Sequence, residues 1–252
     1  GIGDVAVSGD DICLLDTEGA ALFVFSKDSL TLKSVVKTVY GTDGTAIDFV
    51  GPEGIFIRDD LIYIADTAAK RIVVLNRSAL DLAYVINEPE NYPDDADFEP
   101  SKIAVSSSGK IYFTVSGTTE GIVELGSDRK FSRYTGANTP EYDLIDYFWK
   151  NFATEEQLAK MYKTYAPGFS NINIDSDDLV YAVSYDDTSE DKVFRFNAKG
   201  ENIICSPEGQ KITGDDSDYF LNTEGGSEFV DIAVSDFGVY AVLDRKAGRV
   251  FI

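Results

Sequence analysis

Three residues with oxygen-bearing side chains stand just before or at the start of short apolar runs. Glu53 precedes one run, and Asn171 and Asp231 begin two others. Carboxylate and amide oxygens are the ligands that divalent cations such as calcium prefer. If the runs converge, the three side chains could hold such a cation. The equivalent positions of two further runs carry Asp4 and Lys102, and a lysine would oppose a metal ion beside it.

A second group of candidate residues is aromatic and lies between residues 139 and 168. This stretch predicts two short helices, because Thr139 precedes a proline and residues 154–157 form a capping box. The aromatic side chains either pack these helices against the rest of the protein or stack on the ring of a sugar or a peptide. The candidate ligand-binding residues are Trp149, Tyr147 and Tyr162.

Histidine is absent from the 252 residues of the sequence. Its absence removes Ser-His-Asp and Cys-His arrangements, histidine-bound zinc and a side-chain base that titrates near neutral pH. No other catalytic set stands out, so no catalytic residue is predicted. The two cysteines, Cys13 and Cys205, are expected to be free thiols that are buried like small apolar side chains.

The composition is strongly acidic, with a formal net charge of −22 at pH 7. Nucleic-acid binding depends on lysine and arginine side chains that displace counterions from phosphates, so this charge balance argues against a nucleic-acid partner. It argues equally against an anionic membrane surface, and no apolar run is long enough to insert into a membrane. The excess of carboxylates favours solubility, with a cationic partner as the alternative.

The candidate residues are positioned by a sequence unit that recurs five times. The clearest copy runs from Pro52 to Leu75 and contains three apolar runs separated by polar turns. Short runs rich in β-branched and aromatic residues, bounded by turn residues, predict consecutive antiparallel strands. The other copies begin near residues 4, 102, 171 and 231, and most add a weaker fourth run. Residues 39–50, between the first two copies, are expected to form a connecting loop.

Repeated units of about four strands and about 40 to 50 residues predict the blades of a β-propeller. One twisted sheet cannot bury both of its apolar faces alone, whereas neighbouring blades around an axis can. We therefore predict an all-β fold, a β-propeller of four-stranded antiparallel blades that forms one domain over residues 1–252, with five blades visible and a six-bladed ring left open. One apolar residue at the start of each copy is expected to line a central channel; these residues are Val5, Ile55, Ile103, Ile172 and Ile232.

An aspartate closes the second strand of three copies, at Asp16, Asp66 and Asp244. We expect the repeated aspartate to brace the turn that follows, since a catalytic site needs only one copy. Asp175 is likewise expected to form a tight turn, because aspartate supports turns through side-chain to backbone hydrogen bonds.

Short motifs also carry a resemblance to a known repeat family. They are Pro52-x-Gly54-Ile55, residues 62–67 (IYIADT) and residues 71–75 (RIVVL). The units resemble NHL repeats, a resemblance that implies a β-propeller but no particular function. The insert and the following residues 167–184 are similar to extracytoplasmic NHL domains of Gram-positive membrane proteins encoded near sugar transporters. This similarity implies a cell-surface location, with a cytoplasmic one as the alternative.

Three functions remain as hypotheses. The first, which we favour because no catalytic set is present, is a non-enzymatic binding module for a carbohydrate, a peptide or a protein, without a cofactor. The second is a hydrolase similar to metal-dependent lactonases, in which Glu53, Asn171 and Asp231 would hold a divalent ion such as calcium. The third is a structural domain of a larger, membrane-attached protein.

Overall fold

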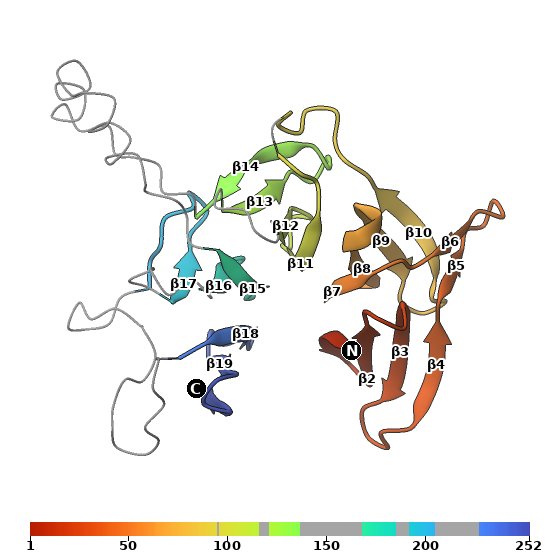
Figure 1. The fold of residues 1–252 in the computed structure, drawn as a ribbon, viewed down its shortest axis with the longest axis horizontal. Helices are drawn as coiled ribbons and strands as arrows, with labels where there is room; N and C mark the ends of the chain where they lie inside the picture. Colours follow the sequence, from red (N-terminus) through yellow and green to blue (C-terminus); the bar gives the residue numbers. More distant parts are fainter. Residues whose placement is uncertain (95, 116–120, 137–167, 185–191, 205–226) are drawn as a thin grey trace, which may run out of the picture.

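The fold is a ring of five antiparallel sheets, the arrangement of a five-bladed β-propeller (Figure 1). The computed structural model describes residues 1–94, 96–115, 121–136, 168–184, 192–204 and 227–252. The predicted all-β class is confirmed. The two helices predicted over residues 139–168 fall on residues outside the described part, save for Gly168.

Each blade is a meander, so strands that are neighbours in the sequence are also neighbours in the sheet. The first blade contains β1 (Ile2–Ser8), β2 (Asp11–Asp16), β3 (Ala21–Ser26) and β4 (Leu32–Val36). The second contains β7 (Pro52–Arg58), β8 (Leu61–Asp66), β9 (Arg71–Asn76) and β10 (Asp81–Ile86). The third contains β11 (Pro100–Val105), β12 (Ile111–Val115), β13 (Ile122–Leu125) and β14 (Phe131–Thr135).

The last two blades have three described strands each. The fourth blade contains β15 (Phe169–Ile174), β16 (Val180–Ser184) and β17 (Val193–Phe196). The fifth contains β18 (Phe229–Val234), β19 (Tyr240–Asp244) and β20 (Arg249–Phe251). A fourth-strand position in the fourth blade is marked by a bridge between Phe196 and Asn202. Helical structure in the described residues is limited to a short 3-10 turn, η1 (Thr67–Ala69), and no helix there is long and apolar enough to cross a membrane.

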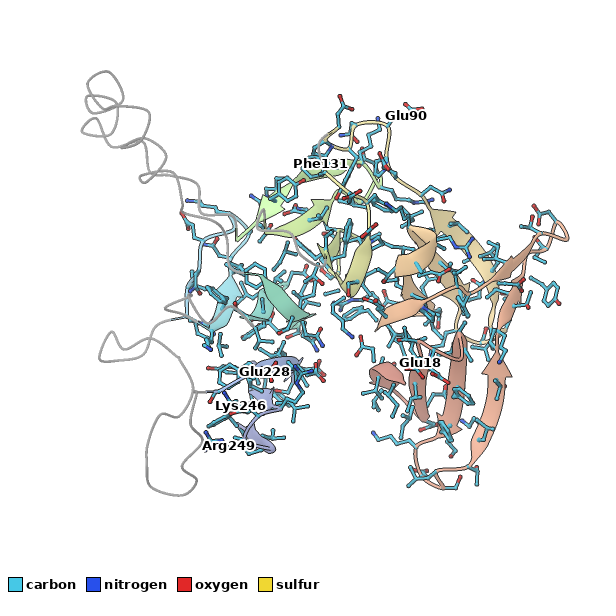
Figure 2. The ribbon with its side chains drawn as sticks, in the orientation of Figure 1. Glu18, Glu90, Phe131, Glu228, Lys246 and Arg249 are labelled. Carbon is cyan, nitrogen blue, oxygen red and sulfur yellow. The ribbon has the colours of Figure 1, made fainter. Side chains whose placement is uncertain are left out.

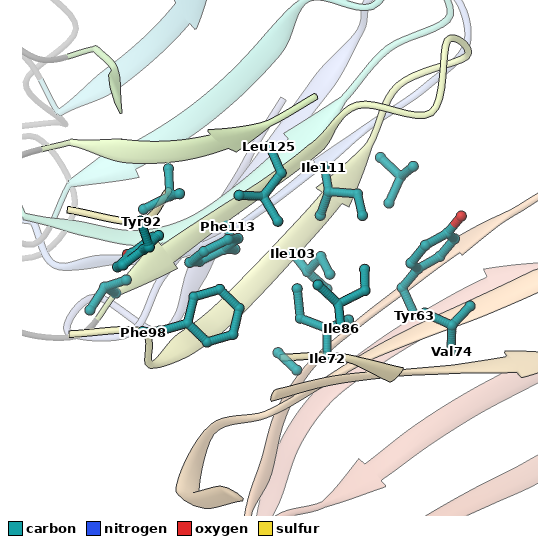
Figure 3. Packing of buried hydrophobic residues seen from close by; sticks show 14 residues of the cluster. Tyr63, Ile72, Val74, Ile86, Tyr92, Phe98, Ile103, Ile111, Phe113 and Leu125 are labelled. Carbon is teal, nitrogen blue, oxygen red and sulfur yellow. The ribbon is translucent and has the colours of Figure 1, made fainter. Parts of the chain in front are cut away.

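The core lies between the blades, because side chains alternate between the two faces of every strand. In β8, Ile62 and Ile64 pack toward the first blade, whereas Tyr63 and Ala65 pack toward the third. Figure 3 shows this second interface, in which residues such as Tyr63 and Ile72 meet Ile103 and Phe113 of the third blade. Burial of each large apolar side chain contributes about 1.5 to 3 kcal/mol, so these interfaces stabilise the ring.

The apolar residues that begin the repeats do not line a central channel, and that prediction is wrong. Ile55, Ile103, Ile172 and Ile232 each belong to the cluster between their own blade and the preceding one. The reason is that a residue on an inner strand points to one face of its sheet, and that face is covered by the neighbouring blade. Val5, the equivalent residue of the first blade, is exposed.

Arginine side chains add polar links across the interfaces. Arg77 of the second blade donates from Nη2 to the carbonyl oxygen of Ser8 in the first blade, at 2.5 Å. Arg58 reaches the carbonyl oxygen of Val105 in the third blade, with Nη2 at 2.6 Å. In each case a charged donor satisfies a main-chain oxygen of the adjacent blade, so consecutive blades are joined by hydrogen bonds as well as by apolar contacts.

The prediction that the repeated aspartates brace the turns that follow them is confirmed for Asp16 and Asp244 and wrong for Asp66, whose carboxylate binds the loop that precedes β7 instead. The carboxylate of Asp66 accepts hydrogen bonds from the amides of Val50 and Gly51, at 2.9 and 3.0 Å, and pairs with Arg71 at 2.8 Å. Asp244 accepts from the amides of Glu228 and Ala247. These bonds satisfy backbone donors in loops and turns that no strand partner reaches.

Asp16 and Asp175 follow the same rule. Asp16 accepts a hydrogen bond from the amide of Gly19, and Asp175 accepts from the amides of Asp177 and Leu179. Both aspartates therefore hold tight turns, which confirms the prediction for each of them.

Residues 39–50 are not the simple loop that the sequence predicted. Most of them form a hairpin of β5 (Thr38–Tyr40) and β6 (Ala46–Asp48). Val39 is buried and Ile47 packs beside it in the cluster between the first two blades. The alternation was too short to recognise in the sequence, and Gly44, with φ of +88°, supplies the left-handed turn.

Cys13 is a buried, free thiol, as predicted, and burial raises its pKa to about 11. A thiol with a raised pKa is a poor nucleophile at neutral pH, so Cys13 acts as a small apolar side chain. Cys205 lies outside the described residues.

Candidate functional site

A β-bulge near the start of every inner strand places one residue at an equivalent position beside the axis of the ring. The register shifts between Ile2 and Asp4 in β1, and corresponding shifts occur in β7, β11, β15 and β18. Such bulges re-aim the side chain that follows them. The five equivalent residues, each just before the first apolar residue of its repeat, are Asp4, Gly54, Lys102, Asn171 and Asp231.

Lys102 is the centre of this arrangement. Its ammonium group donates to the carbonyl oxygen of Gly3 at 2.6 Å and to the carbonyl oxygen of Glu53 at 2.7 Å. It also lies 3.6 Å from Oδ2 of Asp4. The third blade therefore supplies a cation to oxygens of the first and second blades, as a bound metal ion would.

Asp4 is a largely buried carboxylate of the site, with 13% of its side chain exposed. It accepts hydrogen bonds from the amides of Val5, at 2.9 Å, and Ile55, at 3.1 Å. Burial raises the pKa of Asp4, against the opposing effects of the Lys102 ammonium and of the two amides. The carboxylate of Asp231 contributes a smaller rise, so the two acidic groups interact across the ring.

The structure brings together two of the three predicted metal ligands. Asn171 donates from Nδ2 to Oδ1 of Asp231 at 2.5 Å, so β15 and β18 are linked at the axis. Glu53 makes a different contact, because its Oε2 accepts a hydrogen bond from Ser101 at 2.6 Å. The described residues contain no group of three or more Asp, Glu, Cys or His side chains that could hold a metal ion.

Glu53 makes a different contact because it lies one residue before the position in the repeat that Asn171 and Asp231 occupy. The residue equivalent to Asn171 and Asp231 in the second blade is Gly54, which follows the bulge between Pro52 and Gly54. Sequence analysis missed this equivalence, although the spacing to the buried Ile55 would have indicated it.

The site that results is an axial cluster of Asp4, Glu53, Lys102, Asn171 and Asp231. It offers fixed carboxylate, amide and ammonium groups, which can hydrogen-bond a polar ligand. Their polar atoms already bond to one another and to the backbone, which restricts their motion. The aromatic candidates Trp149, Tyr147 and Tyr162 lie outside the described residues.

Comparison with known proteins supports the fold class, a β-propeller. No family model matches the sequence, and no curated protein matches it. The chain is similar over 99% of its length to Kuenenia stuttgartiensis hydrazine synthase, with a TM-score of 0.54 and 14% identity, and it spans 65% of that chain. It is similar over 99% of its length to virginiamycin B lyase from Staphylococcus aureus, with a TM-score of 0.54 and 13% identity, and it spans 80% of that chain.

A third similar structure is the extracellular domain of a hybrid two-component system of B. thetaiotaomicron. The TM-score is 0.51 and the identity is 12%, over 99% of this chain and 29% of that one. At these identities the likeness concerns the fold alone, and the fold is used by an enzyme and by a sensor.

Replacing Lys102 with methionine is expected to lower the free energy of unfolding by about 2 kcal/mol, because buried acceptors would lose their donor. The acceptors are the carbonyl oxygens of Gly3 and Glu53, and the Asp4 carboxylate would lose its counter-charge. Urea unfolding at pH 7 measures the change, with Lys27→Met as the exposed control. Adding Asp4→Asn should recover part of the loss, and strict additivity of the two changes would contradict this role of Lys102.

Proposed function

We propose that this chain is a non-enzymatic binding propeller whose ligand is a carbohydrate, a peptide or a protein. The observation that carries the proposal is the Lys102 ammonium, held at 2.6 and 2.7 Å by two carbonyl oxygens beside Asp4. It places a fixed positive charge where a metal-dependent enzyme of this architecture would need to place its ion. The remaining groups of the axial cluster are hydrogen-bonded rather than poised for proton transfer.

We propose two groups of ligand-binding residues: the axial cluster and, from the sequence, the aromatic residues Trp149, Tyr147 and Tyr162. Aromatic rings stack on sugar rings and on peptide side chains, and polar groups nearby fix the orientation of the ligand. The sequence supports this part of the proposal, since these residues stand in the insert between the third and fourth blades.

We also propose that the protein acts outside the cytoplasm. The resemblance of its repeats to NHL domains of Gram-positive surface proteins supports this location. So does the fold-level similarity to an extracellular domain of a two-component system. A binding propeller attached to a cell surface would present its ligand site to the surrounding medium.

Arrays of defined oligosaccharides and of peptides test the binding proposal. The wild type is expected to bind a restricted set of probes, and Trp149→Ala should weaken that binding by about tenfold, the effect of losing about 1.4 kcal/mol of stacking. Tyr40→Ala, which alters an exposed tyrosine in the β5–β6 hairpin, is the matched control. Equal signals for the wild type and Trp149→Ala would remove the aromatic site, and a wild type that binds no probe would contradict the carbohydrate and peptide assignments.

The hydrolase alternative is supported by the contact between Asn171 and Asp231, which offers two oxygen-bearing side chains at one point. Calcium titration by calorimetry distinguishes it from the binding proposal. Millimolar calcium that binds to the wild type, and not to Asp231→Ala or Asn171→Ala, would favour the hydrolase. Absence of calcium binding is the outcome that we expect.

A further inference from the structure

The face of the first blade that points away from the second is apolar, and no other described segment covers it. The strand pairing aligns its apolar residues in two rows that cross all four strands. The rings of Phe23 and Phe25, from adjacent rows, stack with centroids 6.5 Å apart. No residue of this face belongs to an apolar cluster of the described structure. The first row is Val5, Leu14, Phe23 and Val35, and the second is Val7, Ile12, Phe25 and Leu32.

The equivalent face of the second blade packs against a neighbouring blade. Ile55, Ile64 and Val73 pair in the register of Val5, Leu14 and Phe23 and are buried by the first blade. Ile55 is 4% exposed, whereas its equivalent Val5 is 48% exposed. The first blade therefore carries an interface of the kind that joins blades, and no described blade covers it.

The fifth blade has an exposed apolar face as well, on the side that points away from the fourth blade. Leu243 and Val250 pair as Ala65 and Ile72 do in the second blade. Ala65 and Ile72 are fully buried by the third blade, whereas Leu243 is 39% exposed and Val250 is 58% exposed. This face, too, resembles an interface between blades, and no described blade lies against it.

The two uncovered faces border one opening in the ring. Inner strands β1, β7, β11, β15 and β18 pack in that order, and among the described residues no comparable packing joins β18 to β1. In Figure 1 the first and fifth blades lie on the two sides of this opening. In Figure 2, Glu18 of the first blade and Glu228 of the fifth lie across it from each other.

We propose that the opening holds a sixth blade, a β-sheet with apolar side chains on both faces, formed by further polypeptide of the same chain. A sheet of this kind continues the four interfaces already present and covers both walls at once. A second copy is disfavoured, because each copy carries a net charge of −22 and a flat contact would cover one wall only. The similar lyase structure supports the proposal, since a fifth of its chain lies beyond the match.

The structure predicts the kind of side chain that the sixth blade carries on its two faces and on its inner strand. Its faces must bring aliphatic or aromatic side chains against Phe23 and Leu243. Its inner strand would lie between β1 and β18, beside Asp4 and Asp231, two carboxylates of like charge. A lysine, arginine or amide side chain at that position would stabilise the two carboxylates.

Hydroxyl-radical footprinting tests the proposal by comparing residues 1–252 with the polypeptide extended on either side by the sequence that its gene encodes. Labelling of Phe23 and Phe25 should fall about fivefold in the extended protein, because an interface core excludes water. Tyr40, on the exposed hairpin, should be labelled in both proteins, and Phe113, in the core, in neither. Phe23→Ser should lower the Tm of the extended protein by about 4 °C and leave that of residues 1–252 unchanged.

Three outcomes would overturn the proposal. The first is a gene that encodes fewer further residues than the 35 of the second blade, Pro52–Ile86. The second is unchanged labelling of Phe23 and Phe25 in the extended protein. The third is protection of Phe23 and Phe25 that increases with protein concentration when residues 1–252 are studied alone, together with a mass of twice 27.6 kDa by light scattering. This result would assign the apolar face to a second copy of the chain.

Discussion

Replacing Gly54 with alanine is expected to lower the free energy of unfolding by about 3 kcal/mol, the upper part of the range for overpacking. A Cβ atom at Gly54 would lie 2.1 Å from the carbonyl oxygen of Ser101 and 2.9 Å from Cα of Lys102. Both are backbone atoms of β11, which cannot rotate away as a side chain can. The change would force the second and third blades apart at the axis, and with them the oxygens that hold Lys102.

Urea unfolding followed by circular dichroism measures this effect. Gly41→Ala is the matched control, because the nearest atom to its new Cβ is the end of the flexible Asp43 side chain, at 2.7 Å. The control should change the free energy of unfolding by less than about 1 kcal/mol. Equal stability of Gly54→Ala and the wild type would contradict the close approach of the inner strands.

The second large effect is expected for Glu124→Gln, at about 3 kcal/mol, the lower end of the range for breaking a buried ion pair. The Glu124 carboxylate is buried in the third blade and pairs with Lys110 and Arg133, each at 2.8 Å. Arg133 also donates to the carbonyl oxygen of Ala198 in the fourth blade, at 2.6 Å. Loss of the charge therefore weakens both the third blade and its link to the fourth.

The pH dependence of the free energy of unfolding shows how much of the effect of Glu124→Gln comes from loss of the charge and how much from altered packing. Burial raises the pKa of Glu124, but hydrogen bonds from Lys110 and Arg133 outweigh burial, so its pKa in the folded protein lies below the ordinary value of 4.5. A lowered pKa stabilises the fold above pH 4.5, and this contribution is lost as the pH falls through the folded pKa. The difference between the wild type and Glu124→Gln should therefore shrink below pH 4.5.

Glu99→Gln provides the control for this prediction. Glu99 pairs with Lys70 at 2.8 Å, but both side chains are solvent-exposed, so the change should cost less than about 1 kcal/mol. A constant difference between the wild type and Glu124→Gln from pH 7 to pH 3 would show that the charge of Glu124 does not stabilise the fold.

The blades could be predicted from the sequence because they depend on local patterns. Strands such as β7 and β8 are short apolar runs rich in isoleucine and aromatic residues, and turn residues mark their ends. The burial of Ile55 against the preceding blade could not be predicted in the same way. It depends on which face each neighbour covers, and sequence spacing gives the two faces of a strand without saying what lies against them.

The site was predictable only in part. Asn171 and Asp231 share a position in the repeat, and their contact follows from that equivalence. Glu53 was placed with them, yet a bulge of one residue gives the equivalent position to Gly54. Lys102 was expected only to oppose a metal. Its contacts with Gly3 and Glu53 join residues up to 99 positions apart, which no local pattern encodes.

The opening between the first and fifth blades also affects how the protein unfolds. In the part of the chain that the structure describes, each middle blade packs against two neighbours, whereas the first and fifth blades each pack against one. In an array stabilised by nearest-neighbour interfaces, the end units fray first and the interior units melt last. Residues 1–252 alone therefore have a gradient of local stability, highest in the middle blades and lowest beside the opening, and a closed circle would abolish it.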